Sequence, residues 1–214
     1  MANIFITGGT GYMGGKLIPE LLQRGHQVRA LVRSGSEKKL PSGCEAVIGN
    51  ALDASTYAAN VNGCDTFVHL VGVPHPSPAK AKQFREIDLV AATASILAAQ
   101  QASIQHFVYL SVAQPAPIMK IYQEVRAQAE QMLCDTGMNA TFLRPWYVLG
   151  PGHWWPYALI PAYWLLGKIP STRAGATRLG LVTLTQMTQA LVRAVESPAR
   201  GVRIVDVPGI RAPK

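Results

Sequence analysis

The chain has 214 residues, of which 49% are hydrophobic and 15% are charged. This length and composition suit one globular core and exclude an intrinsically disordered protein. The formal net charge of +8 raises nucleic acid as a possible partner, but the basic residues are dispersed, with no run longer than Lys38-Lys39, so we do not expect nucleic acid binding.

Three scattered cysteines show no metal-ligand spacing. We therefore expect reduced thiols, no metal site and a cytoplasmic location. The most apolar segment, residues 154–167, contains Pro156 and Pro161 and is too short for a membrane span. We expect no transmembrane segment and no peripheral membrane contact, although a basic chain with such a segment could also lie against a membrane surface.

The first predicted element is a strand, Ile4–Thr7, that ends in a cluster of glycines. The cluster contains G-x-x-G-x-x-G at Gly8, Gly11 and Gly14, and an overlapping G-x-G-x-x-G, before a predicted helix over Tyr12–Arg24. Glycine permits positive φ and close backbone approach, and the first amides of a helix attract a pyrophosphate. The pattern predicts a dinucleotide-binding turn, the alternative being a glycine-rich turn without a ligand.

Strands and helices are then predicted in alternation. The further strands are Gln27–Val32, Ala46–Ile48, Thr66–Leu70, His106–Leu110 and Ala140–Leu143. The further helices are Ser55–Val61, Ala79–Gln101 and Lys120–Thr136. Each strand is a short apolar run typical of buried parallel strands, and the alternation predicts an α/β fold with a doubly wound parallel sheet.

The pattern changes after Pro145. All four tryptophans lie in residues 146–170, and a final helix (Thr185–Glu196) and strand (Arg203–Val207) follow. We predict a single domain over residues 1–214, in which residues 145–214 form a small lobe on the substrate side. The Trp154-Trp155 pair either packs this lobe or lines a pocket for an apolar or aromatic substrate.

Several motifs, taken in order, resemble the atypical or extended, epimerase/dehydratase-like branch of the short-chain dehydrogenase/reductase superfamily. They are Thr7–Gly14, Gly49–Asp53, His69–Gly72, Ser111, Tyr122-x-x-x-Arg126 and Leu143-Arg144-Pro145 with Gly150-Pro151. The resemblance covers nearly the whole chain and implies a Rossmann fold that binds NAD(P).

The resemblance also implies which residues approach the cofactor. They are Gly8, Thr10, Gly11, Tyr12, Met13 and Gly14 at the diphosphate, Asn50 and Ala51 at the adenine, Val71 and Gly72 below the ribose, and Tyr122, Arg126, Pro145 and Val148 towards the nicotinamide. Asn50 and Ala51 replace the Asp-Leu pair of relatives, which keeps a polar edge without the charge. Asp53 is instead expected to cap the next helix, in competition with Ser55.

Arg33 ends the second strand, where an acidic residue would bind the ribose hydroxyls of NAD. A guanidinium suits a 2′-phosphate, because it donates two parallel charge-assisted hydrogen bonds. Ser34, Ser36 and Lys38 follow within reach of the same phosphate. The position favours NADP(H), with NAD(H) possible; the alternative is an ordinary surface arginine.

Catalysis in the family uses a serine, a tyrosine and a lysine four residues after the tyrosine. Here the resemblance assigns Ser111 as the group that orients the carbonyl and Tyr122 as the proton donor, with Arg126 at the lysine position. Residues i and i+4 share a helix face, and a cation within about 4–6 Å lowers the pKa of a tyrosine by about one to three units. Alternatively, Tyr122, Arg126 and Glu130 form an ordinary helix stripe with an Arg126–Glu130 ion pair.

Three other side chains invite a functional interpretation. His75 lies in a proline-rich loop and is either an alternative acid or a solvated histidine. His69 lies in an apolar strand and is expected to be a core residue with its hydrogen bonds satisfied. Tyr147 could face the substrate.

The sequence therefore favours an NADP(H)-dependent oxidoreductase that reduces a carbonyl or other unsaturated small molecule. One alternative is a non-catalytic cofactor sensor, as in the nitrogen-metabolite-repression regulators that share this architecture. Another is epimerase- or dehydratase-type chemistry, against which the short final third argues. A monomer or a homodimer is expected, and relatives often dimerise through helices that correspond to Ala79–Gln101 and Lys120–Thr136.

Overall fold

The computed structural model describes residues 1–152, 158, 161, 164–165 and 168–212. Within these residues a seven-stranded sheet has the order β3-β2-β1-β4-β5-β6-β9, and every neighbouring pair is parallel. The strands are β1 (Asn3–Thr7), β2 (Gln27–Val32), β3 (Glu45–Ile48), β4 (Thr66–His69), β5 (His106–Leu110), β6 (Asn139–Leu143) and β9 (Val202–Val205). The predicted α/β fold with a doubly wound parallel sheet is confirmed.

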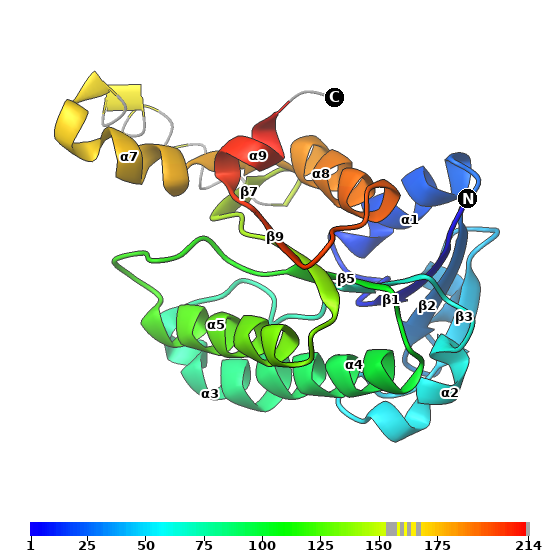
Figure 1. Cartoon of the computed structure of the whole chain (residues 1–214). Coiled ribbons are helices and arrows are strands. Elements are labelled where there is room, and N and C mark those ends of the chain that lie inside the picture. The colour runs from blue at the N-terminus through cyan, green and yellow to red at the C-terminus, as the bar shows by residue number, and fades with distance from the viewer. Residues whose placement is uncertain (153–157, 159–160, 162–163, 166–167, 213–214) are drawn as a thin grey trace.

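Helices cover both faces of this sheet (Figure 1). On one side lie α1 (Gly14–Gln23), α8 (Leu184–Glu196) and α9 (Val207–Arg211), and on the other α2 (Ala58–Val61), α3 (Ala81–Gln83), α4 (Val90–Gln101) and α5 (Lys120–Asp135). The 3-10 turns are η1 (Glu37–Lys39), η2 (Ala54–Thr56) and η3 (Pro78–Lys80), and η4 (Phe84–Leu89) is a π-helical segment. The predicted helix Ala79–Gln101 is therefore built from η3, α3, η4 and α4.

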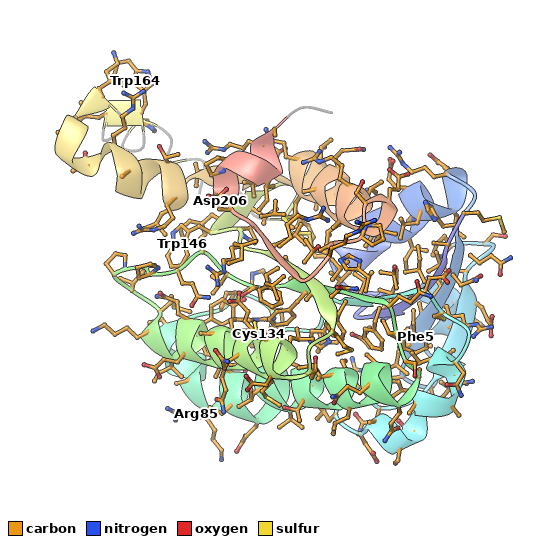
Figure 2. The ribbon with its side chains drawn as sticks, viewed as in Figure 1. Phe5, Arg85, Cys134, Trp146, Trp164 and Asp206 are labelled. Carbon is orange, nitrogen blue, oxygen red and sulfur yellow. The ribbon has the colours of Figure 1, made fainter. Side chains whose placement is uncertain are left out.

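Alternation along the strands divides the core into two layers. Ile4 and Ile6 of β1 pack towards α1 and α8, whereas Phe5 packs towards the α4 side. On that second side the rings of Phe5, Phe67 and Phe107 form a row across three strands, with neighbouring centroids 5.2 and 5.0 Å apart. Figure 2 places Phe5 within this packed interior. The rigid sheet fixes the positions of the loops at its carboxyl edge.

The last third of the chain returns to the sheet. β9 pairs with β6, and α8 packs against α1. A separate two-stranded ribbon joins β7 (Tyr147–Leu149) to β8 (Leu181–Thr183), and α7 (Pro170–Arg178) projects from the body with the exposed Trp164 near its start (Figures 1 and 2). The ribbon was not predicted, because two three-residue strands carry too little periodicity to be recognised. Trp154 and Trp155 lie outside the described residues.

Candidate cofactor and active site

The glycine cluster forms a tight turn between β1 and α1. Gly8 has a φ of +80°, and a Cβ there would lie 2.8 Å from the carbonyl carbon of Leu70. A Cβ on Gly14 would lie 2.5 Å from the backbone oxygens of Gly8 and Gly9. Gly11 closes the turn by donating its amide to the Gly8 carbonyl at 3.0 Å. These contacts require glycine at positions 8 and 14 and leave the outer side of the turn open.

Helix α1 starts directly after this turn. No side chain in the described part of the chain caps its N-terminus, and Thr10, Gly11 and Tyr12 are exposed. The first amides of a helix carry a partial positive charge, so an uncapped N-terminus beside a glycine turn suits the diphosphate of a dinucleotide. The turn lies between β1 and β4, where the strand order reverses, which is the usual ligand crevice of a doubly wound sheet. The residues present therefore fit a dinucleotide.

Residues proposed for the adenosine end lie at the neighbouring strand ends. Arg33 follows β2, which pairs with β1, and its side chain is exposed, with no hydrogen bond or ion pair within the described residues. Asn50 follows β3, but its side-chain oxygen accepts the amide of Leu52 at 3.1 Å. Ala51 is half-buried beside the α4-side core. Asp53 accepts the Ser55 amide and caps η2, as predicted.

A cleft of about 530 Å³ opens where the loops after β1, β4, β5 and β6 meet. Its lining residues come from these loops, from the end of β5, from β7 and from α5: Tyr12, Met13, Val73, Pro74, His75, Pro76, Leu110, Val112, Tyr122, Pro145, Trp146, Tyr147, Val148, Pro151 and Gly152. The structure thus brings together Tyr12, Met13, Tyr122, Pro145 and Val148, five of the residues that the sequence assigned to the cofactor. Tyr147 and His75 line the same cleft.

The Tyr122 ring contacts two buried side chains. Its ring centroid is 4.9 Å from that of the buried Phe84 and 5.2 Å from the guanidinium carbon of Arg126. Arg126 is 4% exposed, so the cation expected beside Tyr122 is present and shielded from water. This geometry places a phenol at the cleft wall with a positive charge against its ring.

Arg126 makes its main ion pair with Asp88, at 2.6 Å, and donates to the Leu110 carbonyl at 2.9 Å. The Arg126–Glu130 ion pair considered as an alternative is wrong, because Glu130 accepts from Arg144 and Gln114. Burial lowers the pKa of Arg126, but Tyr122, Tyr109 and Asp88 more than offset this, so the net shift is upward and the guanidinium stays charged.

The Asp88 carboxylate was missed at the sequence level. Its side chain is fully buried in η4, and burial raises its pKa while Arg126 opposes that rise. Its second oxygen accepts the Val73 amide at 3.0 Å. The one available signal was an acidic residue among apolar ones in the predicted helix Ala79–Gln101, a position rarely left without a partner.

Ser111 occupies a different place from Tyr122. It is 3% exposed, and its hydroxyl has no hydrogen-bond partner among the described residues. Leu110 and Val112 line the cleft, whereas Ser111 between them does not. The described lining of the cleft therefore includes Tyr122 but not Ser111.

His69 is a core residue. Its Nδ1 atom lies 2.9 Å from the hydroxyls of both Thr7 and Ser95, while Nε2 has no partner within the described residues. Burial, and secondarily Arg126, lower the pKa of His69 to about 3. The ring is therefore neutral near pH 7.

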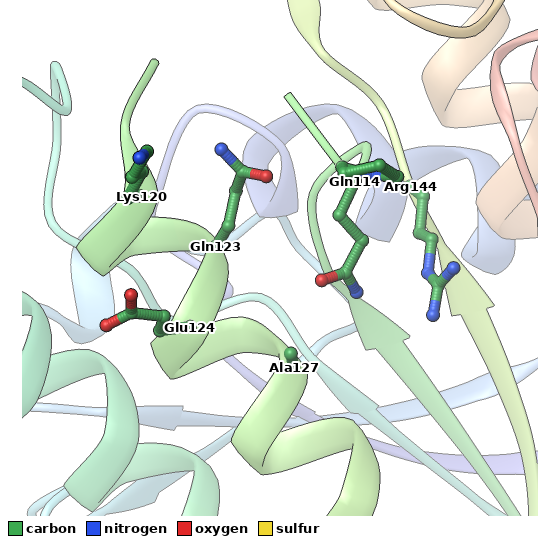
Figure 3. Close-up of a pocket in the computed structure, with 7 residues that line it drawn as sticks. Gln114, Lys120, Gln123, Glu124, Ala127 and Arg144 are labelled. Carbon is green, nitrogen blue, oxygen red and sulfur yellow. The ribbon is translucent and has the colours of Figure 1, made fainter. Parts of the chain in front are cut away.

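A second depression, of about 470 Å³, lies on the other side of α5 (Figure 3). Figure 3 shows Lys120, Gln123 and Glu124 along α5, with Gln114 and Arg144 on the segments beside this helix. Gln123 is already hydrogen-bonded to the backbone of Ala116 and Ile118, and Gln114 and Arg144 both bind Glu130. These polar groups hold the loop together, and we assign no ligand to the depression.

Among the described residues, no group of three or more metal-ligating side chains comes together. In the same part of the chain, every helix is too short or too polar to cross a bilayer.

A parallel sheet with a glycine turn at its reversal point and an adjoining cleft is the architecture of a dinucleotide-binding protein. A family model described as NAD(P)H-binding matches residues 8–151. The chain belongs to this NAD(P)H-binding family.

Comparison with individual proteins agrees with this assignment. The chain is 28% identical over 168 residues to 4-hydroxy-2-methyl-3-oxo-4-farnesyl-3,4-dihydroquinoline-1-oxide ketoreductase of Stigmatella aurantiaca, covering 68% of this chain and 50% of that protein. It is 26% identical over 147 residues to the photosystem II assembly factor Ycf39 of Synechocystis, covering 66% and 43%. The chain spans half or less of the length of these two relatives.

The fold matches solved structures over nearly its whole length. One is the Bordetella bronchiseptica enzyme WbmH in complex with NAD+, with a TM-score of 0.71, 20% identity and coverage of 96% of this chain and 75% of that one. At this level of identity the likeness establishes the fold.

Proposed function

We propose that the protein is an NADP(H)-dependent oxidoreductase that reduces a carbonyl or similar unsaturated group on an apolar or aromatic small molecule. The observation that carries the proposal is Tyr122, whose ring lines a cleft next to the glycine turn with a buried cation behind it. A positioned phenol is a suitable general acid when a cation stabilises the charge that develops on it.

The bound dinucleotide would supply the hydride, which adds to the carbonyl carbon. Tyr122 donates its hydroxyl proton to the carbonyl oxygen, and solvent returns a proton to the tyrosine. Arg126 stabilises the transient phenolate from the side of the ring, and the loop after β6 confines the substrate. The glycine turn and the start of α1 hold the diphosphate, as derived above.

Two observations support an apolar or aromatic substrate. The cleft walls include Val73, Leu110, Val112 and Trp146 beside the more polar His75 and Tyr147, and a volume of about 530 Å³ is typical of a small-molecule site. The Stigmatella relative is named as a ketoreductase of a farnesyl-bearing dihydroquinoline oxide. Both favour a flat or bulky apolar ketone or quinone.

Preference for NADP(H) rests on Arg33. Its exposed guanidinium, at the end of the strand beside the glycine turn, can form a bidentate contact with a 2′-phosphate. Calorimetric titration should give tighter binding for NADPH than for NADH. In Arg33→Ala we expect the NADPH affinity to fall about tenfold while NADH binding is unchanged. Equal affinities of the starting protein for NADPH and NADH would contradict the preference for NADP(H), but not the proposed oxidoreductase activity.

Turnover is tested with NADPH and an aromatic quinone such as phenanthrenequinone. Replacing Tyr122 with Phe should lower kcat by a factor of about 10²–10⁴ and leave the Kd for NADPH unchanged. Tyr57→Phe is the matched control, because this phenol lies in the core at α2, outside the cleft. If both variants turn over like the starting protein, Tyr122 is not the proton donor.

A second candidate is a non-catalytic cofactor sensor. It is favoured by the commitment of Arg126 to Asp88 and by a relative that is named as an assembly factor. Tight NADPH binding without NADPH consumption, for ketones and quinones alike, would support the sensor over the enzyme.

A further inference from the structure

The buried ion pair between η4 and α5 connects several parts of the molecule at once. Asp88 is fully buried and Arg126 is 4% exposed, yet their charges meet at 2.6 Å. Burying two charges costs several kcal/mol per ion in general, which the mutual attraction offsets only with close geometry and further hydrogen bonds. Asp88 and Arg126 each make further hydrogen bonds. The partners in those bonds indicate the role of the ion pair.

Three of those contacts end at the backbone beside the cleft. Asp88 accepts the Val73 amide at 3.0 Å, and Arg126 donates to the carbonyl of Leu110 at 2.9 Å and, more weakly, to that of Val71 at 3.5 Å. Val71 and Val73 follow β4, and Leu110 ends β5. The pair therefore joins the exits of two strands whose following loops form cleft walls.

Gly72 shows how closely the pair approaches this backbone. A Cβ at Gly72 would lie 2.5 Å from the Arg126 Nη2 atom and 3.3 Å from the Asp88 Oδ1 atom. The space that a side chain would occupy there is filled by the two charged groups. The loop thus lies directly on the ion pair.

The π-helical segment η4 brings two side chains to the same place. Phe84 and Asp88 are both buried residues of η4, and a π-helical turn in a longer helix is often found at a functional site. Phe84 contacts the Tyr122 ring, while Asp88 holds the guanidinium that lies against the same ring. One short segment therefore sets both neighbours of Tyr122.

We propose that Asp88 is a positioning residue of the candidate active site: through Arg126 it fixes the Tyr122 ring and the loop 71–73 in the arrangement that receives the nicotinamide end of the cofactor. This inference rests on the proposed function for its catalytic part only. Asp88 touches neither substrate nor cofactor in this arrangement. Its effect on the reaction passes through Arg126 and Tyr122.

The first test uses the free protein and needs no turnover. Hydrogen exchange followed by mass spectrometry is measured on the peptide that contains Val73, in which Pro74 and Pro76 contribute no amide hydrogen. Asp88→Asn keeps the shape but removes the charge, and we expect exchange at Val73 to rise about threefold or more. Glu86→Gln, on the same segment but exposed and paired with Lys82 across an i,i+4 spacing, is the matched control and should not change it.

The second test uses NADPH fluorescence, which increases when the reduced ring is immobilised away from water. Asp88→Asn should bind NADPH with a Kd within about threefold of the starting protein, because the diphosphate site is intact. The emission gain on binding should fall. An unchanged gain together with unchanged Val73 exchange would overturn the proposal.

The third test is a double-mutant cycle on kcat with phenanthrenequinone. Asp88→Asn should lower kcat about tenfold in the starting protein and no more than about twofold in Tyr122→Phe, because it acts through the tyrosine. Equal losses in both backgrounds would contradict the link to Tyr122. If the starting protein shows no turnover, the proposed function fails, while the exchange and fluorescence results still decide whether Asp88 positions the site.

Should Asp88→Asn fail to fold, Arg126→Lys serves in the same assays. The ammonium keeps the charge but cannot reach Asp88 and the Leu110 carbonyl with a planar fork. We expect the same directions of change at Val73 and in the fluorescence gain. Values equal to those of the starting protein would overturn the proposal.

Discussion

Two ion pairs lie one turn apart on α5 and have opposite polarity. At Arg126 the helix contributes the cation, and the partner Asp88 is fully buried. At Glu130 the helix contributes the anion, and the side chain of its partner Arg144 is 22% exposed. The first pair holds loops of the cleft, and the second holds the exit of β6 and the loop that contains Gln114.

The comparison shows that two ion pairs on one helix can differ in role: one supports the cleft, and the other supports the fold. The Arg126 pair is closed off from water and is in contact with the proposed proton donor. The Glu130 pair is open at one end, and water can solvate the arginine when the acid is removed. Damage to the first pair should therefore cost stability and function together, whereas damage to the second should cost a smaller amount of stability.

The largest effect is expected from Arg126→Met, which leaves the Asp88 carboxylate buried without a cation. Breaking a buried pair in this way typically costs about 3–5 kcal/mol. Urea unfolding at pH 7 measures the free energy of unfolding directly. At pH 5 the loss should be smaller, because burial raises the pKa of Asp88 and a neutral carboxyl removes the penalty. If Arg126→Met lowers the free energy of unfolding at pH 7 by no more than Glu130→Gln does, the two ion pairs do not differ in their contribution to stability.

Acid should destabilise the protein through histidines on both faces of the sheet. Burial lowers the pKa of His69 to about 3, with Arg126 as the second cause, and that of His106 to about 4, with Arg203 as the second cause. Unfolded histidine has a pKa of about 6.5, so their contribution to stability is complete above that pH and is lost as the pH falls towards 3–4. Asp88 contributes with the opposite sign, because its pKa is raised.

Between pH 6.5 and 5 each histidine should lower the free energy of unfolding by about 1.6 kcal/mol. His69→Asn keeps a polar group near Thr7. In this variant the free energy of unfolding should depend less steeply on pH, because the contribution of His69 is removed. A slope that is unchanged in this variant would mean that His69 takes up a proton in the folded state. In Arg126→Met the contribution of His69 to this pH dependence should be smaller, because Arg126 is the second cause of its lowered pKa. The comparison tests whether the charge of Arg126 acts on His69.

The smallest effect is expected from Glu130→Gln. Arg144 keeps access to water, so we expect a loss of about 1–2 kcal/mol in urea unfolding. The Kd for NADPH and the exchange of the Val73 amide should match those of the starting protein. A change in either would show that the second pair is also coupled to the cleft.

Most of the fold could be predicted because strand and helix periods are local signals. The strands Gln27–Val32 and His106–Leu110 were predicted with the observed ends. The ribbon of β7 and β8 was missed, because each of its strands has only three residues and carries too little periodicity.

The candidate site was predicted in part for the same reason. Tyr122 and Arg126 are neighbours through helix geometry, and the structure keeps them together. The partner of Arg126 is 38 positions away in sequence, and nothing in the local spacing favours Asp88 over Glu130. Long-range charge pairing depends on which helices pack side by side, which a single sequence does not specify.

The two charged groups occupy the space that a side chain at position 72 would need, and this has an evolutionary consequence. A glycine beside a nucleotide site is ordinarily interpreted as a record of contact with the ligand. Here the same position would stay invariant in a descendant that had lost all affinity for nucleotides, provided that the two charges remained. Residues 72, 88 and 126 should therefore change as a set among descendants of this chain, and a larger residue at 72 should appear only where the acid and the base have both been replaced.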